Sequence, residues 1–299
     1  MMAAARDLKV QGEIRLNEPM SRHTSWRTGG PAEMFFIPAS IADLSTFLTE
    51  LDVEIPLFWH GVGTNLLVRD GGIPGVVVSA SKILRDVERA DHYLVRSGAG
   101  VPCTQLARQC IRWELGPSEF FAGIPGTVGG ALAMNAGAHG GETWDRVESV
   151  TTIDRGGEIY ERAPSEYSVA YRSVTGPEDE WFLGATFRFE QDVIPSVDTL
   201  NTMLERRKTT QPLGLPSCGS VFRNPDGDHS ARLIEASGLK GYRIGGAEVS
   251  DKHANFIINR DDASATDIEE LIEHVRQTVL EQHDVGLVHE VLIVGEAKQ

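Results

Sequence analysis

Glycine is concentrated in one uncharged stretch of the chain, and this stretch restricts the fold more than any other sequence feature. The segment GIPGTVGGALAMNAGAHGG, residues 123–141, contains seven glycines in nineteen residues and no Asp, Glu, Lys or Arg. Glycine adopts positive φ angles and lets a bound group approach the main chain, because it has no Cβ atom. Only Thr127, Asn135 and His139 bring strong hydrogen-bonding side chains to it. We therefore expect a segment that makes its contacts mainly through the backbone.

Two further glycine stretches precede this one, HGVGTNLLVRDGG at residues 60–72 and SGAGVP at 97–102. Consecutive free N–H groups in such loops form concave sites for anions, so three loops of this kind suit a ligand with a pyrophosphate. The known phosphate motifs do not fit, because no lysine follows the glycines as in GxxxxGK[ST] and neither GxG pair has the third glycine of GxGxxG. The alternative for each loop is a tight turn between strands.

Composition excludes several classes of partner. A chain of 299 residues predicts two or three domains. Its net charge of −15 argues against a surface for nucleic acid or anionic membrane. We find no apolar run of membrane-spanning length, and the N-terminus lacks the apolar core of a signal peptide. Three cysteines without a CxxC pair indicate reduced thiols in a cytoplasmic protein; Cys103 and Cys110 are expected to face the core, and no metal site is expected.

The apolar periodicity predicts a mixture of helices and short strands. We expect a helix after Ser40, one with Pro102 in its first turn, one through Leu200 and Leu204, and a C-terminal one that opens on a capping box from Thr266 to Glu269. Six short runs are typical of β-strands: GVVVSA, HYLVRSG, VESVTTID, WFLGATFRFE, HANFIIN and EVLIVG. Without a regular βαβ rhythm, this pattern favours an α+β fold. Residues 190–198 are expected to form a linker at a domain boundary.

Six ordered motifs make the chain similar to a known family. GVGTNLL, FFAGIPGTVGGALAMNAGAHGGE, YSVAYR, SCGSVFRNP and HEVLIVGE, together with SDKHANFIIN, resemble the UDP-N-acetylenolpyruvoylglucosamine reductases of bacterial peptidoglycan synthesis. The resemblance implies a two-subdomain FAD-binding fold of the vanillyl-alcohol-oxidase type and a C-terminal α+β substrate-binding domain. The corresponding ranges are 1–80, 81–195 and 199–299, with a strand at about 286–299 that returns to the active site. Only thirty-five residues separate Arg172 from Lys208, which resembles the short subgroup without an inserted substrate loop.

The resemblance implies a two-step reduction with dissociable FAD. NADPH reduces the flavin, and the reduced flavin passes hydride to the enolpyruvyl group of UDP-N-acetylglucosamine-enolpyruvate, which gives UDP-N-acetylmuramate. No nucleic acid, membrane or covalent flavin link is implied, and we expect a monomer. The implied FAD contacts are mostly backbone N–H groups: Gly61, Val62, Gly63, Thr64, Asn65, Leu66, Gly123, Ile124, Pro125, Gly126, Thr127, Val128, Gly129, Asn135, Ala136 and Gly137.

Three polar residues match the catalytic positions of the family. Arg172 is suited to clamp the substrate carboxylate and stabilise the enolate, since a guanidinium donates two parallel hydrogen bonds. Ser220 matches the proton donor, although a serine hydroxyl is a weak acid and needs nearby cations. Glu290 matches a glutamate that orients the enol and assists proton delivery.

Three further residues match substrate contacts, and two positions depart from the family. Tyr171, Lys208 and Asn224 match the contacts. The family often has PEVR where this chain has His289 for the proline and Leu292 for the arginine, so one electrostatic partner is missing. Two alternatives therefore stay open: another FAD oxidoreductase of the same fold, or an idle nucleotide-binding protein that keeps only the glycine loops.

Overall fold

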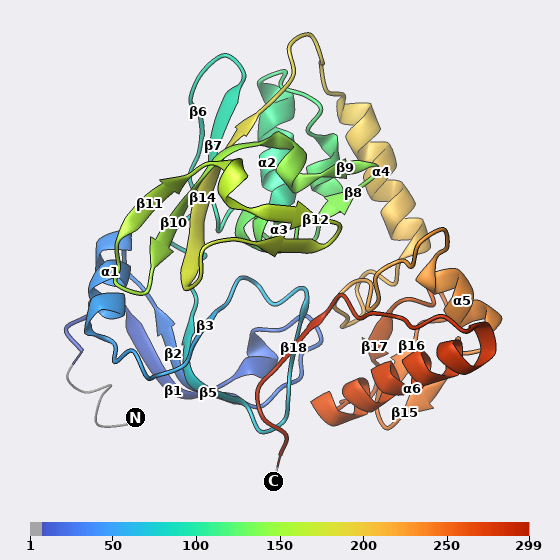
Figure 1. Cartoon of the computed structure of the whole chain (residues 1–299). Coiled ribbons are helices and arrows are strands. Elements are labelled where there is room, and N and C mark those ends of the chain that lie inside the picture. The colour runs from blue at the N-terminus through green and yellow to red at the C-terminus, as the bar shows by residue number, and fades with distance from the viewer. Residues whose placement is uncertain (1–7, 299) are drawn as a thin grey trace. The chain divides into compact units, whose positions relative to one another are not determined.

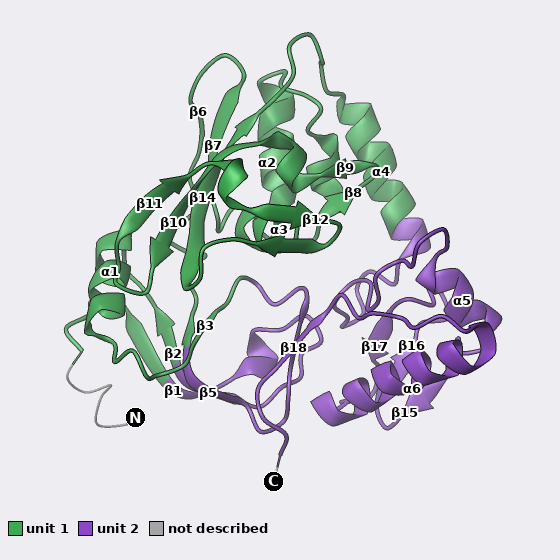
Figure 2. Cartoon of the chain, viewed as in Figure 1, with its two compact units in different colours: residues 1–15, 35–61, 77–207 green, residues 16–34, 62–76, 208–299 purple. Residues whose placement is uncertain are grey.

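A computed structural model describes residues 8–298 and divides them into two compact units (Figure 1, Figure 2). The first unit holds residues 8–15, 35–61 and 77–207, and the second holds 16–34, 62–76 and 208–298. Both units combine helices with mostly antiparallel strands, which confirms the α+β class. The division into 1–80, 81–195 and 199–299 stays a prediction.

One four-stranded sheet has the order β1-β2-β5-β3, and the division between the units falls within three of its strands. Three of the five points at which the chain passes between the units therefore lie within strands, and the other two follow Gly61 and Arg207. The strands are β1 Glu13–Pro19, β2 Pro31–Ile37, β5 Ile73–Val78 and β3 Leu57–Trp59.

The centre of the first unit is a five-stranded antiparallel sheet in the order β11-β10-β14-β7-β6. Its longest pairing joins β10 to β14, with Val150 opposite Ala185, and both of these residues are buried. The run VESVTTID corresponds to β10 over its full length, because its alternating apolar residues fit a strand with one buried face. The strands are β11 Ile159–Arg162, β10 Val147–Asp154, β14 Glu180–Arg188, β7 Leu94–Gly98 and β6 Val87–Arg89.

Four helices belong wholly or mainly to the first unit, and two cysteines lie in its core. Ser40 caps α1 by accepting a hydrogen bond from the Asp43 N–H at 3.1 Å, as predicted. Pro102 precedes α2 as its N-cap, one position earlier than predicted. Cys103 and Cys110 face the core, also as predicted, and burial raises the pKa of each thiol to about 12. The helices are α1 Ile41–Glu50, α2 Cys103–Arg112, α3 Val128–Ala133 and α4 Val197–Thr210.

Two short hairpins complete the first unit. The hairpin of β12 and β13 turns at Tyr171 and Arg172, and Arg172 has a φ of +53° in the left-handed region. The hairpins are β12 Ser168–Ala170 with β13 Ser173–Thr175, and β8 Gly137–Ala138 with β9 Gly141–Glu142.

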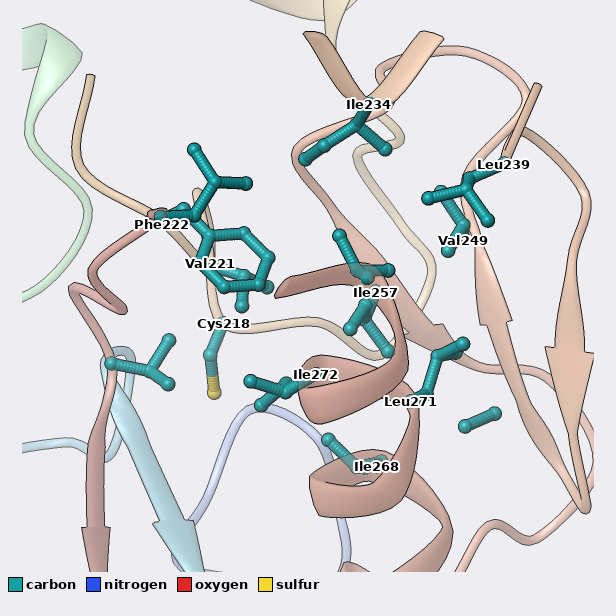
Figure 3. Close-up of a cluster of buried hydrophobic side chains, with 14 of the residues drawn as sticks. Cys218, Val221, Phe222, Ile234, Leu239, Val249, Ile257, Ile268, Leu271 and Ile272 are labelled. Atoms are coloured by element: carbon teal, nitrogen blue, oxygen red, sulfur yellow. The ribbon is translucent and has the colours of Figure 1, made fainter. Parts of the chain in front are cut away.

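The second unit is built around the long helix α6 and a separate hydrophobic core (Figure 3). Ile268, Leu271, Ile272, Val275 and Val279 form the buried face of this helix, as the periodicity predicts. A second helix, a three-stranded antiparallel sheet and one parallel pair of strands surround α6. The elements are α5 Ser230–Ala236, α6 Ala265–His283, β15 Arg243–Ile244, β16 Ala247–Val249, β17 Ile257–Asn259, β4 Leu66–Val68 and β18 Leu292–Val294.

The capping box predicted for α6 is wrong by two residues. The observed box joins Ser264 and Asp267, each of which accepts the other's backbone N–H at 3.0 Å. Thr266 lies inside the first turn of the helix and does not cap it. The Asp70 carboxylate accepts the Thr266 N–H at 2.9 Å and the Thr266 hydroxyl at 2.7 Å. The helix start therefore depends on a residue 196 positions away, which the local sequence pattern does not contain.

Residues 8–298 contain neither a membrane-spanning helix nor a cluster of metal-ligating side chains. No helix in this range has both the length and the apolar character needed to cross a bilayer. Within the same residues, no three His, Cys, Asp or Glu side chains form a group that could hold a metal ion.

Candidate active site

The glycine stretches at 97–102 and 123–141 lie side by side in the first unit. The Val128 N–H donates to the Val101 carbonyl at 2.9 Å, and the Gly129 N–H donates to the Ala99 carbonyl at 2.8 Å. A Cβ atom at Gly129 would approach the Ala99 Cβ to 2.9 Å, so this close packing itself requires glycine. Packing against Ala99 is therefore sufficient to explain why position 129 is a glycine.

Thr127 lies near two glycines, Gly61 and Gly130, that have open space where a side chain would be. A Cβ atom added at Gly61 or at Gly130 would meet only the Thr127 hydroxyl, at 3.6 and 3.9 Å respectively. Thr127 is 5% exposed, and its hydroxyl makes no hydrogen bond with any residue between 8 and 298. The hydroxyl oxygen is not fully buried and the space at both glycines is open, so a ligand oxygen can reach it. This cradle has the features expected for the pyrophosphate of FAD.

Arg172 is fixed against the end of the 123–141 stretch. Its two terminal nitrogens donate to the Asn135 carbonyl at 3.1 Å and the Gly137 carbonyl at 2.8 Å. The guanidinium also lies 4.9 Å from the Tyr171 ring centroid and 3.8 Å from the Glu142 carboxylate. The structure therefore joins two predicted sets, the catalytic arginine and the FAD-loop residues Asn135 and Gly137.

The side chain of Asn135 is engaged within the protein. Its amide nitrogen donates to Glu142 Oε2 at 2.8 Å and to the Ala170 carbonyl at 3.3 Å, while its oxygen accepts the Trp144 N–H at 3.1 Å. Asn135 is 2% exposed and has a φ of +47°. A ligand contact at this residue would come from the main chain, and the side chain organises the segment that holds Arg172. No sequence pattern pointed to Glu142, whose carboxylate contacts both the Asn135 amide and the Arg172 guanidinium.

Ser220 and Glu290 come together in the second unit. The Glu290 N–H donates to the carbonyl of Val221 at 2.6 Å, directly after Ser220. Phe222 and His289 form an antiparallel bridge, and the Arg223 N–H donates to the Val288 carbonyl at 2.9 Å. Two predicted catalytic residues, seventy positions apart in the chain, thus lie on paired segments. Arg172 belongs to the first unit.

The loop that contains GVGTN joins the same arrangement. The Asn65 amide nitrogen donates to the Glu290 carbonyl at 3.0 Å, and the Leu292 N–H donates to the Asn65 carbonyl at 3.1 Å. The Cys218 thiol lies 3.5 Å from the carbonyls of Gly63 and Leu66. Residues 62–66, Ser220 and Glu290 are therefore neighbours within the second unit.

The predicted substrate contacts lie in more exposed positions. Tyr171 is 45% exposed, and Lys208, near the end of α4, is also exposed. Asn224 is exposed as well, while its Oδ1 accepts the Ser230 N–H at 3.2 Å at the start of α5. Lys208 and Asn224 are polar residues at the surface of the second unit, where a large polar ligand can reach them.

A positive environment surrounds one end of the 123–141 stretch. Burial, followed by the charges of Arg206 and Arg207, lowers the pKa of His139. His139 packs on Gly123, where an added Cβ would lie 2.9 Å from the imidazole Cδ2. Although the whole chain has a net charge of −15, cationic groups are therefore gathered beside this loop.

Comparisons with known proteins agree with this geometry. Residues 32–162 match the FAD binding domain family, and residues 211–294 match the UDP-N-acetylenolpyruvoylglucosamine reductase C-terminal domain. UDP-N-acetylenolpyruvoylglucosamine reductase from Alkalilimnicola ehrlichii is 55% identical over 100% of both chains. The same-named protein from Methylococcus capsulatus is 54% identical, over 94% of this chain and 93% of its own.

A solved structure shows the same fold. The UDP-N-acetylenolpyruvylglucosamine reductase of Thermus caldophilus superposes with a TM-score of 0.77 at 31% identity, over 95% of this chain and 98% of its own. This match and the two family models confirm the expected FAD-binding fold with a C-terminal domain, and they favour the reductase over both alternatives. The chain therefore belongs to the UDP-N-acetylenolpyruvoylglucosamine reductase family, as an oxidoreductase with FAD as its cofactor.

Proposed function

We propose that the protein uses NADPH to reduce the enolpyruvyl group of UDP-N-acetylglucosamine-enolpyruvate, which gives UDP-N-acetylmuramate. FAD, when bound, would supply the redox chemistry for hydride transfer from NADPH to the double bond. The relatives named UDP-N-acetylenolpyruvoylglucosamine reductase, one of them 55% identical over the full chain, support this choice of substrate. A monomeric state and a cytoplasmic location are part of the same proposal.

The observation that carries the proposal is the pairing of Ser220 with Glu290 beside the Asn65 loop. The hydrogen bond of 2.6 Å between the Glu290 N–H and the Val221 carbonyl sets the two segments next to each other. Asn65, a proposed FAD contact, holds the Glu290 carbonyl at 3.0 Å. A proton donor, a carboxylate and a cofactor loop within one unit match the needs of a reduction that ends in proton transfer.

The chemistry assigns a distinct role to each polar residue. Hydride addition to the terminal carbon of the enolpyruvyl group leaves negative charge on the adjacent carbon and its carboxylate. Arg172 stabilises that charge, since its guanidinium is already oriented by two backbone carbonyls. Ser220 gives its hydroxyl proton to the carbon that bears the ether oxygen, and Glu290 orients the enol and assists this transfer.

The remaining residues bind and position the ligands. Thr127 and Gly61 would hold the FAD pyrophosphate at the open cradle, through the hydroxyl and the main chain. Tyr171, Lys208 and Asn224 would contact the substrate. Leu292, 52% exposed, supplies no charge where the family often has arginine, so proton delivery relies on Glu290 and the neighbouring cations.

An anaerobic half-reaction experiment tests the proposal. We expect a yellow protein that NADPH bleaches and that UDP-N-acetylglucosamine-enolpyruvate then rapidly reoxidises. Ser220→Ala should keep the rate of bleaching but slow reoxidation by about 10²–10⁴-fold, the usual loss of a general acid. Ser217→Ala, a change three residues earlier, is the matched control and should keep both rates. Equal loss of both half-reactions in Ser220→Ala would contradict the proton-donor role.

A further inference from the structure

Asn255 makes an unusual set of contacts with the segment that follows Ser220. Its Oδ1 accepts the Phe222 N–H at 2.9 Å, and its Nδ2 donates to the Phe222 carbonyl at 2.8 Å. Its own carbonyl accepts the Val221 N–H at 2.9 Å. Asn255 is 4% exposed, so these bonds form out of contact with bulk water. One residue therefore satisfies three polar groups of the backbone beside Ser220: the Val221 N–H and both groups of Phe222.

The geometry of the opposite side explains why an asparagine is needed. Phe222 and His289 lie opposite each other as a non-hydrogen-bonded antiparallel pair, because the neighbours of Phe222, Val221 and Arg223, make the hydrogen bonds to the partner segment. The N–H and carbonyl of Phe222 therefore point away from that segment. No strand covers the outward side of Phe222 within the described chain. The Asn255 amide, with one donor and one acceptor, takes the place of a neighbouring strand.

This arrangement holds the Ser220 segment from two sides. The 288–290 segment, which includes Glu290, binds one edge, and Asn255 binds the other. Val221 and Phe222 are 0% and 2% exposed, so their side chains anchor this segment in the core (Figure 3). The hydroxyl of Ser220 is attached to a backbone whose position depends on this amide.

We propose that Asn255 is a positioning residue for proton transfer: its side-chain amide, hydrogen-bonded to both backbone groups of Phe222, fixes the segment that carries Ser220 relative to Glu290. The inference rests on the proposed function, in which Ser220 is the proton donor. The sequence contained a signal for it, a polar residue inside the apolar run HANFII, but no role follows from that pattern alone.

The test compares two asparagines that differ in what they hold. Asn255→Asp is nearly isosteric and loses only the donor to the Phe222 carbonyl, while Asn255→Ala loses both side-chain bonds. Asn259→Ala is the matched control, because Asn259 also joins two backbone groups, the Trp26 carbonyl and the Ala263 N–H, each at 2.8 Å. All three are made in the full chain with FAD bound.

Both half-reactions are then measured by anaerobic stopped flow. The Asn255 variants should be reduced by NADPH within about twofold of the wild-type rate, while their reoxidation by the substrate slows about 10–100-fold, as expected for a misplaced reacting group. In a Ser220→Ala background the Asn255 change should add less than about twofold, because it acts through Ser220. Asn259→Ala should keep the wild-type rate of reoxidation.

Hydrogen exchange provides a readout that does not depend on substrate. Asn255→Ala, which removes the acceptor of the Phe222 N–H, should accelerate exchange of that amide at least about tenfold relative to Asn259→Ala, since local opening sets this rate. Wild-type protein that the substrate fails to reoxidise would overturn the proposed function and this inference together. Reoxidation of the Asn255 variants at the wild-type rate, an additive loss with Ser220→Ala, or unchanged exchange would overturn the inference alone.

Discussion

The side chain of Asn135 offers the sharpest test of how the first unit holds Arg172. Asn135→Gly removes all three side-chain hydrogen bonds but retains a residue suited to the φ of +47°. Loss of the bond to the Glu142 carboxylate costs about 1.5–3 kcal/mol, and an unpaired Trp144 N–H costs about 1–3 kcal/mol. Because water can replace part of these bonds, we expect the free energy of unfolding to fall by about 2–4 kcal/mol.

Asn135→Ala separates the cost of backbone strain from the cost of the lost side-chain hydrogen bonds. It loses the same bonds and also places a Cβ atom in the left-handed region, which costs about 1 kcal/mol more. Urea unfolding with unchanged m-values measures both differences. Both variants should also lose activity, since the segment that binds Arg172 is loosened. Unfolding of Asn135→Gly within about 0.5 kcal/mol of wild type, or greater stability of Asn135→Ala than of Asn135→Gly, would refute the reasoning.

Three further changes test separate parts of the structure. Gly129→Ala should lower the free energy of unfolding by about 1–3 kcal/mol through overpacking against Ala99, while Gly130→Ala should not, which thermal melts compare. Asp70→Asn should cost about 1–2 kcal/mol in urea titrations, because the Asp70 carboxylate caps α6, and unchanged stability would contradict this cap. The pKa of His139 is lowered in the folded protein, so the unfolded chain binds more protons below about pH 6.5. Wild type should therefore lose more stability than His139→Asn when the pH falls from about 7.5 to 5.5. Parallel profiles of unfolding free energy against pH would exclude the effect.

Local patterns were sufficient for several elements of the fold. The apolar spacing placed the buried face of α6, and Ser40 marked the start of α1. The run from Val147 to Asp154 matched β10. In each case the periodicity and the cap lie in one short segment, so the physical signal is contained in that segment.

Long-range contacts explain what the sequence could not provide. The start of α6 depends on the Asp70 carboxylate, 195 positions before Ala265. The neighbourhood of Ser220 and Glu290 depends on the bridge between Phe222 and His289. The identity of these site residues came from the family resemblance, while their pairing became visible only with the fold. Apart from the bond between Asn135 and the Glu142 carboxylate, the amides of Asn135 and Asn255 bond to backbone groups, and backbone groups carry no sequence signal.

The most direct measurement of the central claim is single-turnover reoxidation of the NADPH-reduced protein by UDP-N-acetylglucosamine-enolpyruvate, with wild type, Ser220→Ala and Ser217→Ala side by side. Wild type and Ser217→Ala should be reoxidised rapidly and should form UDP-N-acetylmuramate, while only Ser220→Ala should be slow. Reduced wild-type protein that stays bleached in the presence of this substrate, or Ser220→Ala that turns over as fast as Ser217→Ala, would contradict that claim.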